Sequence, residues 1–194
     1  VAALNKKEKR FCVGSVGIAE SGGYWGMSTW LLEFSEQAPW RPTGAQTGGA
    51  SCNMIVRSQD FTGLSGFPEE YQPGEDTVLF HSLREAGCQQ WFVRDASVDH
   101  YNHKGFAPFW RQQFKLGYHS ALVRQKIELK GSLATRFRLL SFGLWAPKIF
   151  LIMARLFAAG PRDWPRAAFF FPGIVLGVCI WTGGFLTKVY EKCE

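Results

Sequence analysis

The sequence lacks any closely spaced pair of cysteines. Its five cysteines stand far apart, at Cys12, Cys52, Cys88, Cys179 and Cys193. Zinc sites need ligands in close pairs, and disulfide scaffolds need a dense, even-numbered set. The pattern therefore favours reduced thiols in a cytosolic compartment. The front of the sequence also lacks a secretory signal, because the apolar run that begins at Phe11 is short.

Acidic side chains are scarce in the second half of the chain. Residues 104–194 carry 14 basic and 4 acidic side chains, a balance of +10, whereas residues 1–103 carry 8 basic and 12 acidic ones, a balance of −4. We therefore expect the back half to meet something anionic. A nucleic acid would fit this charge, but basic residues beside an apolar segment have a simpler explanation in a membrane surface. We expect no nucleic-acid partner.

The longest stretch without a charged side chain runs from residue 167 to residue 187. These 21 residues form about 31 Å of helix, enough to cross a hydrocarbon core of roughly 30 Å. Arg166 and Lys188 bracket the stretch, and Trp181 and Tyr190 stand towards one end, where interfacial anchors occur. We expect a transmembrane helix at about 167–187. The alternative is a buried core helix of a larger soluble protein.

An earlier apolar stretch, residues 137–159, is interrupted by cationic side chains. Lys148 and Arg155 are seven residues apart and so share one helical face, while Pro147 breaks or kinks the helix. Such a helix either lies in the membrane interface against anionic headgroups or crosses the membrane with snorkelling side chains. By the positive-inside rule, the basic residues around it place the front half in the cytoplasm: Arg124, Lys126, Lys130, Arg136 and Arg138.

The front half alternates strand-like and helix-like segments. The strand-like segments are residues 11–16, 50–57, 90–93 and 96–100. Residues 24–34 are expected to form a helix, and residues 76–86 have helical spacing with Gly87 as the C-cap. The segment 41–49, with Pro42 and three glycines, is typical of a mobile loop. This alternation predicts an α/β layered architecture.

Glu75 and Asp76 follow Pro73-Gly74 and open the second predicted helix. There the carboxylates lie against the positive end of the helix dipole and the free first-turn amides. This environment keeps an Asp ionised, as a general base must be before it accepts a proton. The simpler interpretation is that one of them only caps the helix. The physics alone favours the cap.

Five features follow one another between Gly49 and His100. They are a strand with Asn53 that ends in Arg57, the turn SGFPE from Ser65 to Glu69, the pair Glu75-Asp76 opening a helix, a helix that ends before Gly87, and a strand that ends in His100. This order resembles the C-terminal half of the catalytic domain of family 2 glycosyltransferases, which have the GT-A fold. The turn departs from the family's Gly-Gly-Phe-Asp-Glu pattern at Ser65 and Pro68.

The resemblance implies an inverting glycosyl transfer from a nucleotide-diphosphate sugar to an acceptor hydroxyl. It makes Asp76 the catalytic base and Glu75 a residue that shapes the acceptor side. The substrate-binding residues it implies are Asn53, Gly66, Phe67 and Glu69. With a membrane segment in the same chain, we expect the acceptor to be lipid-linked or a saccharide of the cell envelope.

The resemblance also implies a divalent metal, Mn²⁺ or Mg²⁺, on the donor diphosphate. His100 is a candidate ligand, since a histidine at the end of this strand binds the metal in some GT-A enzymes and imidazole suits Mn²⁺ better than Mg²⁺. An isolated surface histidine is the simpler interpretation. The family's Asp-x-Asp motif does not occur in the sequence. We therefore expect the main metal motif and the nucleotide-binding half to lie outside this chain, which should be inactive alone.

The basic, aromatic run after His100 resembles the helix that follows the catalytic domain in membrane-attached members of the family. Arg111 and Lys115 are four residues apart and suit a diphosphate or a lipid headgroup. An interfacial helix without catalytic duties is the simpler interpretation. The Gln-x-x-Arg-Trp motif of processive synthases is matched here only with Lys115 and Leu116 in its last two places, so a processive polymerase is not supported.

The sequence thus predicts a partial GT-A-type α/β domain over 1–103, a basic interfacial segment over 104–135 and hydrophobic helices over 136–194. The expected location is a membrane, with the catalytic part facing the cytoplasm and membrane lipids as partners. A second hypothesis is a non-catalytic, membrane-anchored binding or assembly module with a degenerate GT-A-like fold. An Asp-x-Asp motif encoded upstream, after a nucleotide-binding pattern, would favour the enzyme.

Overall fold

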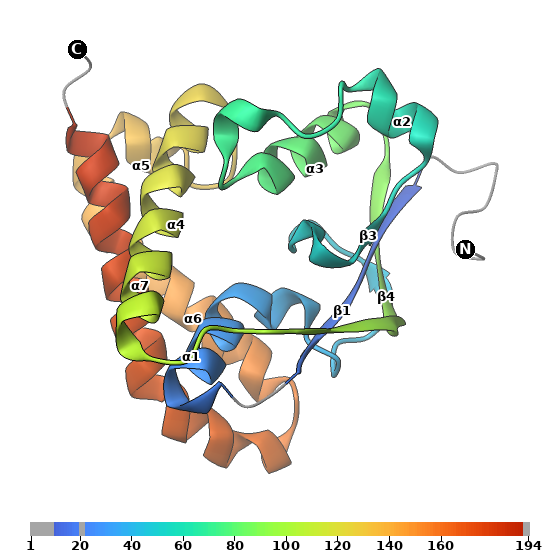
Figure 1. The fold of residues 1–194 in the computed structure, drawn as a ribbon. Coiled ribbons are helices and arrows are strands. Elements are labelled where there is room, and N and C mark those ends of the chain that lie inside the picture. The colour runs from blue at the N-terminus through green and yellow to red at the C-terminus, as the bar shows by residue number, and fades with distance from the viewer. Residues whose placement is uncertain (1–9, 20–21, 192–194) are drawn as a thin grey trace. The chain divides into compact units, whose positions relative to one another are not determined.

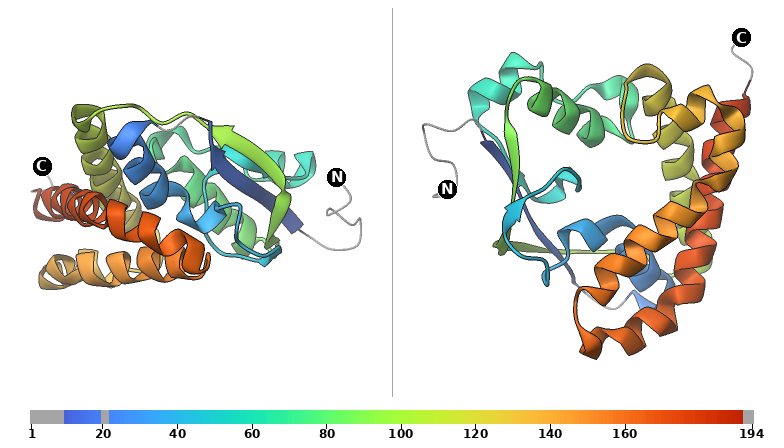
Figure 2. Two further views of the ribbon diagram at one scale, coloured as in Figure 1. Left: turned by 90° about the horizontal axis from the view of Figure 1, so that it is seen from below. Right: turned by 180° about the vertical axis from the view of Figure 1, so that it is seen from behind.

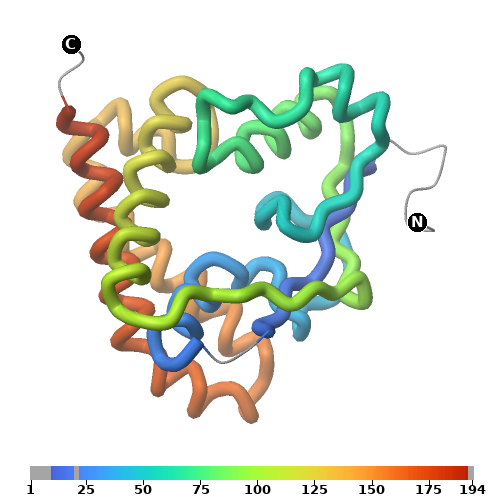
Figure 3. Tube along the Cα trace, in the orientation of Figure 1, coloured from blue at the N-terminus to red at the C-terminus, as the bar shows by residue number. Residues whose placement is uncertain are grey.

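The computed structural model describes residues 10–19 and 22–191. The chain divides into two compact units: unit 1 holds Val1–Ala19 and Glu33–His100, and unit 2 holds Glu20–Leu32 and Tyr101–Glu194. The course of the chain through each unit can be followed in Figure 3. Each unit is described by itself. Among the cysteines, Cys12, Cys52, Cys88 and Cys179 are free, and Cys193 lies outside the described residues.

Unit 1 is built on a mixed four-stranded sheet with the strand order β2-β4-β1-β3 (Figure 1). The strands are β1 (Arg10–Ile18), β2 (Gly44–Ala45), β3 (Met54–Ile55) and β4 (Gln89–His100). The two long central strands, β1 and β4, run parallel, whereas β3 pairs with β1 and β2 pairs with β4 in the antiparallel sense. All residues of β1 from 11 to 16 are buried, as expected for a central strand covered on both faces.

The core of unit 1 forms where α3 (Glu75–Glu85) packs on the two central strands. Leu79, Phe80 and Leu83 of α3 are buried against Phe11 and Phe92 of the sheet. Gly87 ends the helix with φ 82° and donates its N–H to the carbonyl of Arg84, which confirms the predicted C-cap. The other helical segments of this unit are η1 (Ser35–Gln37), η2 (Ser51–Asn53), α2 (Ser58–Gly63) and η3 (Glu69–Tyr71).

Two predictions for the sheet were wrong in detail. The predicted strand 50–57 is only two residues long. Before Met54, the backbone forms hydrogen bonds to a side chain where a strand would pair with a neighbouring strand. The amide of the buried Gln37 accepts from the N–H of Ala50 (2.5 Å) and donates to its carbonyl (3.2 Å). The predicted mobile loop 41–49 contains β2, which pairs with Trp91 and Phe92 of β4. Segments 90–93 and 96–100 form one strand with a register shift between them.

Unit 2 is a helical bundle. Its helices are α1 (Gly23–Phe34, up to Leu32 in this unit), α4 (Phe106–Lys126), α5 (Leu133–Arg136), η4 (Arg138–Gly143), α6 (Trp145–Phe157), η5 (Pro161–Asp163) and α7 (Trp164–Tyr190). Helix α7 lies between α4 and α6, as the left view of Figure 2 shows. The coarse prediction of an α/β fold with C-terminal helices is therefore confirmed, while its assignment to the GT-A type stays a prediction.

Glycines allow α7 to approach its neighbours closely. A Cβ atom at Gly117 of α4 would collide with the carbonyl of Trp181, and one at Gly184 would collide with the carbonyl of Phe114. Near the start of α7, Gly173 donates its N–H to the hydroxyl of Tyr24 (2.9 Å). The positions of these glycines show that they permit close contact between helix backbones.

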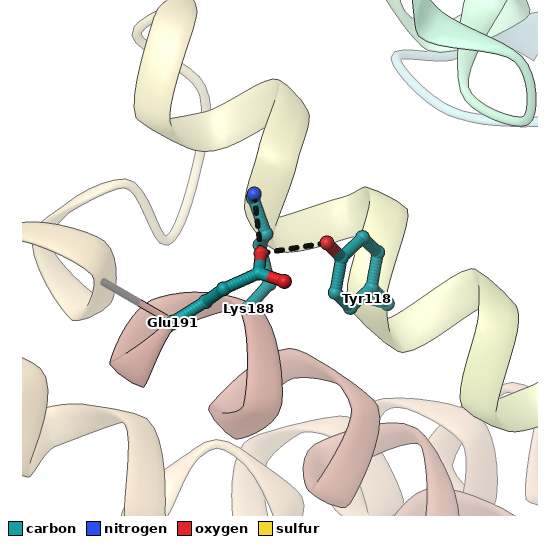
Figure 4. Close-up of polar contacts among 3 residues, drawn as sticks. All are labelled: Tyr118, Lys188 and Glu191. Atoms are coloured by element: carbon teal, nitrogen blue, oxygen red, sulfur yellow. Dashed lines mark hydrogen bonds and ion pairs between the residues drawn. The ribbon is translucent and has the colours of Figure 1, made fainter. Parts of the chain in front are cut away.

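A polar cluster of three residues joins the middle of α4 to the C-terminal end of α7 (Figure 4). The hydroxyl of Tyr118 donates to Oε2 of Glu191 (2.6 Å), and the ammonium of Lys188 approaches the same oxygen at 2.6 Å. These donors lower the pKa of Glu191, with Lys188 as the larger cause. Because the cluster is largely exposed, it contributes little to stability.

Candidate functional site

The pair Glu75-Asp76 forms the first turn of α3, as the sequence predicted. Its backbone enters the helix through Gly74, whose φ of 125° suits glycine. Oδ1 of Asp76 accepts the N–H of Thr77 (2.6 Å) and its hydroxyl (3.3 Å). Oε2 of Glu75 turns back to accept the N–H of Gly74 (2.8 Å). Both carboxylates are therefore held by first-turn donors.

The pKa of Asp76 is raised above that of an ordinary aspartate. Burial is the largest cause; the charge of Glu75 adds to it, while hydrogen bonds from the backbone of Thr77 and Ser51 act against it. The sequence analysis weighed only the dipole and the amides, which favour the ionised form. It missed the desolvation, because that depends on how the segment before β3 folds beside the helix.

That neighbouring segment is η2. The hydrogen bond from the Ser51 backbone to Asp76 places η2 at the carboxylate, and the charge of Asp76 is felt at Cys52. The Cys52 residue is exposed overall, yet desolvation of its sulfur is the largest cause of its raised pKa, ahead of Asp76. The structure thus brings Asp76, Glu75 and η2 together at one end of α3. Such a site can hold a carboxylate ready to accept a proton.

Asn53, predicted to bind substrate, contacts both central strands of the sheet, and its role in substrate binding stays a prediction. Its Nδ2 donates to the carbonyls of Ser15 (2.9 Å) and Ala96 (2.8 Å), on either side of the register shift between β1 and β4. A Cβ atom at Gly14 would collide with both Ala96 and the Asn53 amide. The side chain is therefore committed to main-chain oxygens through its amide nitrogen.

The predicted turn lies between α2 and η3. Ser65 has φ 61° and Gly66 has φ 76°, so two successive residues adopt the left-handed region. The ring of Phe67 packs edge-on against Phe61 with 5.5 Å between centroids and remains 38% exposed. Glu69 is exposed at the start of η3. The turn can therefore offer an aromatic face and a carboxylate to a ligand.

His100 lies at the end of β4, as predicted. Its ring packs on Phe34 with 4.6 Å between centroids, and its Nδ1 is buried without a hydrogen-bond partner among the described residues. No group of three or more His, Cys, Asp or Glu side chains in residues 10–19 and 22–191 could hold a metal ion. The role of His100 as a metal ligand stays a prediction. The metal motif expected outside this chain stays a prediction.

Arg111 belongs to unit 2 and is exposed on α4, as is Lys115. Both lie on the part of α4 that contacts α7 through Phe114 and Gly117. The structure does not bring Arg111 and Asp76 into one unit.

Unit 2 also exposes an apolar face. Among the described residues, the segments Arg138–Phe157 and Pro161–Tyr190 are long and apolar enough to cross a membrane. The apolar window of the first is only 17% buried, and that of the second 44%. Exposed on α6 are Trp145, Ala146, Pro147, Phe150, Leu151, Ala154 and Phe157, which we call the α6 face.

The cationic side chains of α6 do not lie on that face. Lys148 and Arg155 border the buried Ile152 instead, on the side towards α7. The ammonium of Lys148 lies 4.0 Å from the ring centre of Trp181, a cation–π contact. Lys148 therefore packs on an aromatic ring of α7, and both alternatives for this segment, an interfacial helix and a second span, stay predictions.

Sequence reasoning missed two buried glutamines that shape unit 1. Gln37, fully buried, joins the carbonyl of Gly14 (3.2 Å) to Ala50, and Gln90 donates to the carbonyl of Gly48 (2.6 Å). Nothing in their sequence surroundings separates them from surface glutamines.

No family model, curated protein or solved structure matches this chain significantly.

Proposed function

We propose that this chain supplies the acceptor side of an inverting glycosyltransferase that uses a nucleotide-diphosphate sugar, with Asp76 as the general base. The site of Asp76 carries the proposal: the carboxylate is held by Thr77 at the start of α3, and its pKa is raised by burial. A carboxylate with a raised pKa binds a proton more strongly than an ordinary one, which suits a base. A carboxylate that only caps a helix gains nothing from desolvation.

In this mechanism the carboxylate of Asp76 takes the proton of an acceptor hydroxyl. The hydroxyl oxygen forms a bond to the anomeric carbon as the bond from that carbon to the diphosphate breaks, and the nucleoside diphosphate leaves with the electron pair. Thr77 holds Oδ1 in place, which fixes the orientation of the carboxylate. Glu75, tied to Gly74, borders the acceptor side. The exposed Phe67 and Glu69 are available to the transferred sugar.

We further propose that the protein attaches to a membrane through the α6 face. A span through α7 would bring the exposed Arg111 and Lys115 of the adjoining α4 into the bilayer. A charged side chain at the bilayer centre costs about 2.5–3.5 kcal/mol even on insertion scales. Helix α7 also packs between α4 and α6, as a core helix does. The α6 face, with Trp145 at one end, suits insertion into one leaflet, and the basic residues before it favour the cytoplasmic side.

Sugar transfer by the full-length protein tests this function. Asp76→Asn should lower the rate of transfer by about 10²- to 10⁴-fold, the usual contribution of a general base. Glu85→Gln, which removes an exposed carboxylate at the other end of α3, should leave the rate unchanged. Undiminished transfer by Asp76→Asn would overturn the role of the base. Absence of transfer by the unmodified full-length protein, with membrane attachment retained, would favour the non-catalytic module.

A further inference from the structure

A pocket of about 360 Å³ lies in unit 2, between the end of α4 and α5. Its charged lining residues are Arg124, Lys126 and Arg136, against one carboxylate, Glu128. The hydroxyls of Ser132 and Thr135 also line it, but both are bound to the protein itself. Ser132 joins the N–H of Leu129 to the carbonyl of Ile127, and Thr135 donates to the carbonyls of Arg124 and Ser132. The hydroxyls thus shape the wall, and the net positive charge is left to attract an anion.

Arg124 is the fixed cation of this pocket. Its Nε donates to the carbonyl of Lys130 (2.9 Å), and its Nη1 donates to the carbonyl (3.0 Å) and the hydroxyl of Ser120. Its Nη2 makes no hydrogen bond in the described part of the chain. Burial alone lowers its pKa, with no carboxylate acting against it. A guanidinium held by neutral groups and partly removed from water is matched by an anion with several acceptor oxygens.

Arg136 supplies a second cation, exposed at the rim of the pocket. It is exposed and makes no side-chain hydrogen bond or ion pair with any residue that the structure describes. Arg124 and Arg136 therefore bring two guanidinium groups to one cavity. Glu128, which is exposed, offsets only part of this charge.

The rim of the pocket continues into exposed apolar side chains. Leu133 lines the pocket and is 57% exposed, and it is followed by Phe137, Leu139 and Leu140, which are 59%, 81% and 54% exposed. A small soluble anion would gain nothing from contact with these apolar side chains. A ligand that joins an anionic head to an apolar chain would satisfy both parts of the surface.

We propose that the pocket between α4 and α5 binds the phosphate headgroup of a membrane lipid, with Arg124 and Arg136 on the phosphate oxygens and Leu133 beside the acyl chains. The ligand class is an anionic phospholipid. This lipid binding goes beyond the proposed sugar transfer and rests only on the proposed membrane attachment. Failure of the lipid-binding proposal would therefore leave the sugar-transfer proposal intact, and the reverse also holds.

Equilibrium binding of pyrene-labelled phosphatidylglycerol to the full chain in dodecyl maltoside micelles tests the site. The signal is energy transfer from tryptophan, and pyrene-labelled phosphatidylcholine is the comparison lipid. We expect tighter binding of phosphatidylglycerol, and Arg136→Gln should weaken it about five-fold, as expected for one basic residue near an anionic lipid. Arg162→Gln, an exposed arginine outside the pocket, is the matched control and should change nothing.

Competition separates the two sources of phosphate. Unlabelled phosphatidylglycerol should displace the probe, whereas inorganic phosphate at the same concentration should not. Displacement by inorganic phosphate would overturn the lipid in favour of a soluble phosphate ligand. Equal affinity for both lipids, or affinity unaffected by Arg136→Gln and by Arg124→Lys, would overturn the pocket itself. Arg124→Lys keeps the positive charge but removes the planar guanidinium group, with its several N–H donors. An unchanged far-ultraviolet circular dichroism spectrum would show that this variant is folded.

Discussion

The Nδ2 atom of Asn53 lies 2.8 Å from the main-chain oxygen of Ala96, where β4 shifts its register against β1. The same nitrogen lies 2.9 Å from the oxygen of Ser15. One side chain therefore donates to two main-chain carbonyls beside the register shift. Unpaired polar groups inside a protein are costly, so this position is constrained by the sheet before any ligand is considered.

We predict that Asn53→Ala destabilises unit 1 by about 0.5–1.5 kcal/mol, the net contribution of a typical hydrogen bond, because the part-buried carbonyl of Ser15 loses its donor. Urea unfolding followed by tryptophan fluorescence measures the change. Asn53→Asp should be worse, because a carboxylate would face two carbonyl oxygens. If Asn53 acted only on substrate, both variants would unfold at the same urea concentration as the wild type.

The turn before η3 offers a matched pair of substitutions. Ser65 has φ 61°, a conformation that costs a residue with a Cβ about 1–2 kcal/mol but costs glycine little. Ser65→Gly should therefore stabilise the protein, by up to about 1 kcal/mol after the greater entropy of unfolded glycine is subtracted. Gly66→Ala should destabilise it, because Gly66 has φ 76° and its Cβ would lie 3.2 Å from the ring of Phe61.

The comparison is made by thermal unfolding. Opposite signs for the two variants are the expected result. Destabilisation by Ser65→Gly would mean that the Ser65 side chain contributes more than its backbone conformation costs.

Sequence patterns predicted the elements that depend on residues close together in the chain. Hydrophobic spacing and Gly87 were sufficient for α3, and the two strand-like segments 90–93 and 96–100 flank the register shift of β4. Side chains that act on distant backbone were not predictable, since the amide of Asn53 reaches β1 and β4, and that of Gln37 reaches Gly14 and Ala50. The raised pKa of Asp76 belongs to the same class, because η2 supplies part of its surroundings.

The glycines of α7 give a second matched pair. A Cβ at Gly184 would collide with the backbone of Phe114 on α4, whereas one at Gly183 would meet nothing within 4 Å. Gly184→Ala should destabilise unit 2 by about 1–3 kcal/mol, the usual cost of overpacking. Gly183→Ala should stabilise it by up to about 1 kcal/mol, because alanine is the better helix former. Thermal unfolding in detergent measures both changes. An equal loss of stability in the two variants would contradict the close approach of α4 and α7.

Membrane attachment through the α6 face can be separated from a span through α7. Leu151 lies in the middle of the α6 face and is 51% exposed. Burial of a leucine contributes about 1.5–3 kcal/mol, so Leu151→Glu should lower binding to phospholipid vesicles at least about ten-fold. Ile55→Glu, an exposed apolar residue of unit 1, is the control and should bind like the wild type. Retention of Leu151→Glu in carbonate-washed membranes would favour the span.

Asp76→Asn separates a catalytic carboxylate from a helix cap through the pH dependence of stability. The pKa of Asp76 is raised in the folded state, so the folded protein binds the proton more tightly than the unfolded chain does. Stability therefore falls as pH rises from the unfolded pKa to the folded pKa, and the cost of the buried charge is fully present above that range. Asparagine keeps an oxygen for the N–H of Thr77 without the charge. Above the folded pKa, Asp76→Asn should thus unfold at a temperature equal to or higher than the wild type, and the difference should narrow as pH falls towards 3.8, the ordinary value. Thermal unfolding of both proteins across this range measures it. A wild type that is the more stable of the two at neutral pH would make the Asp76 charge a helix cap, since favourable interaction with the dipole would then outweigh its desolvation.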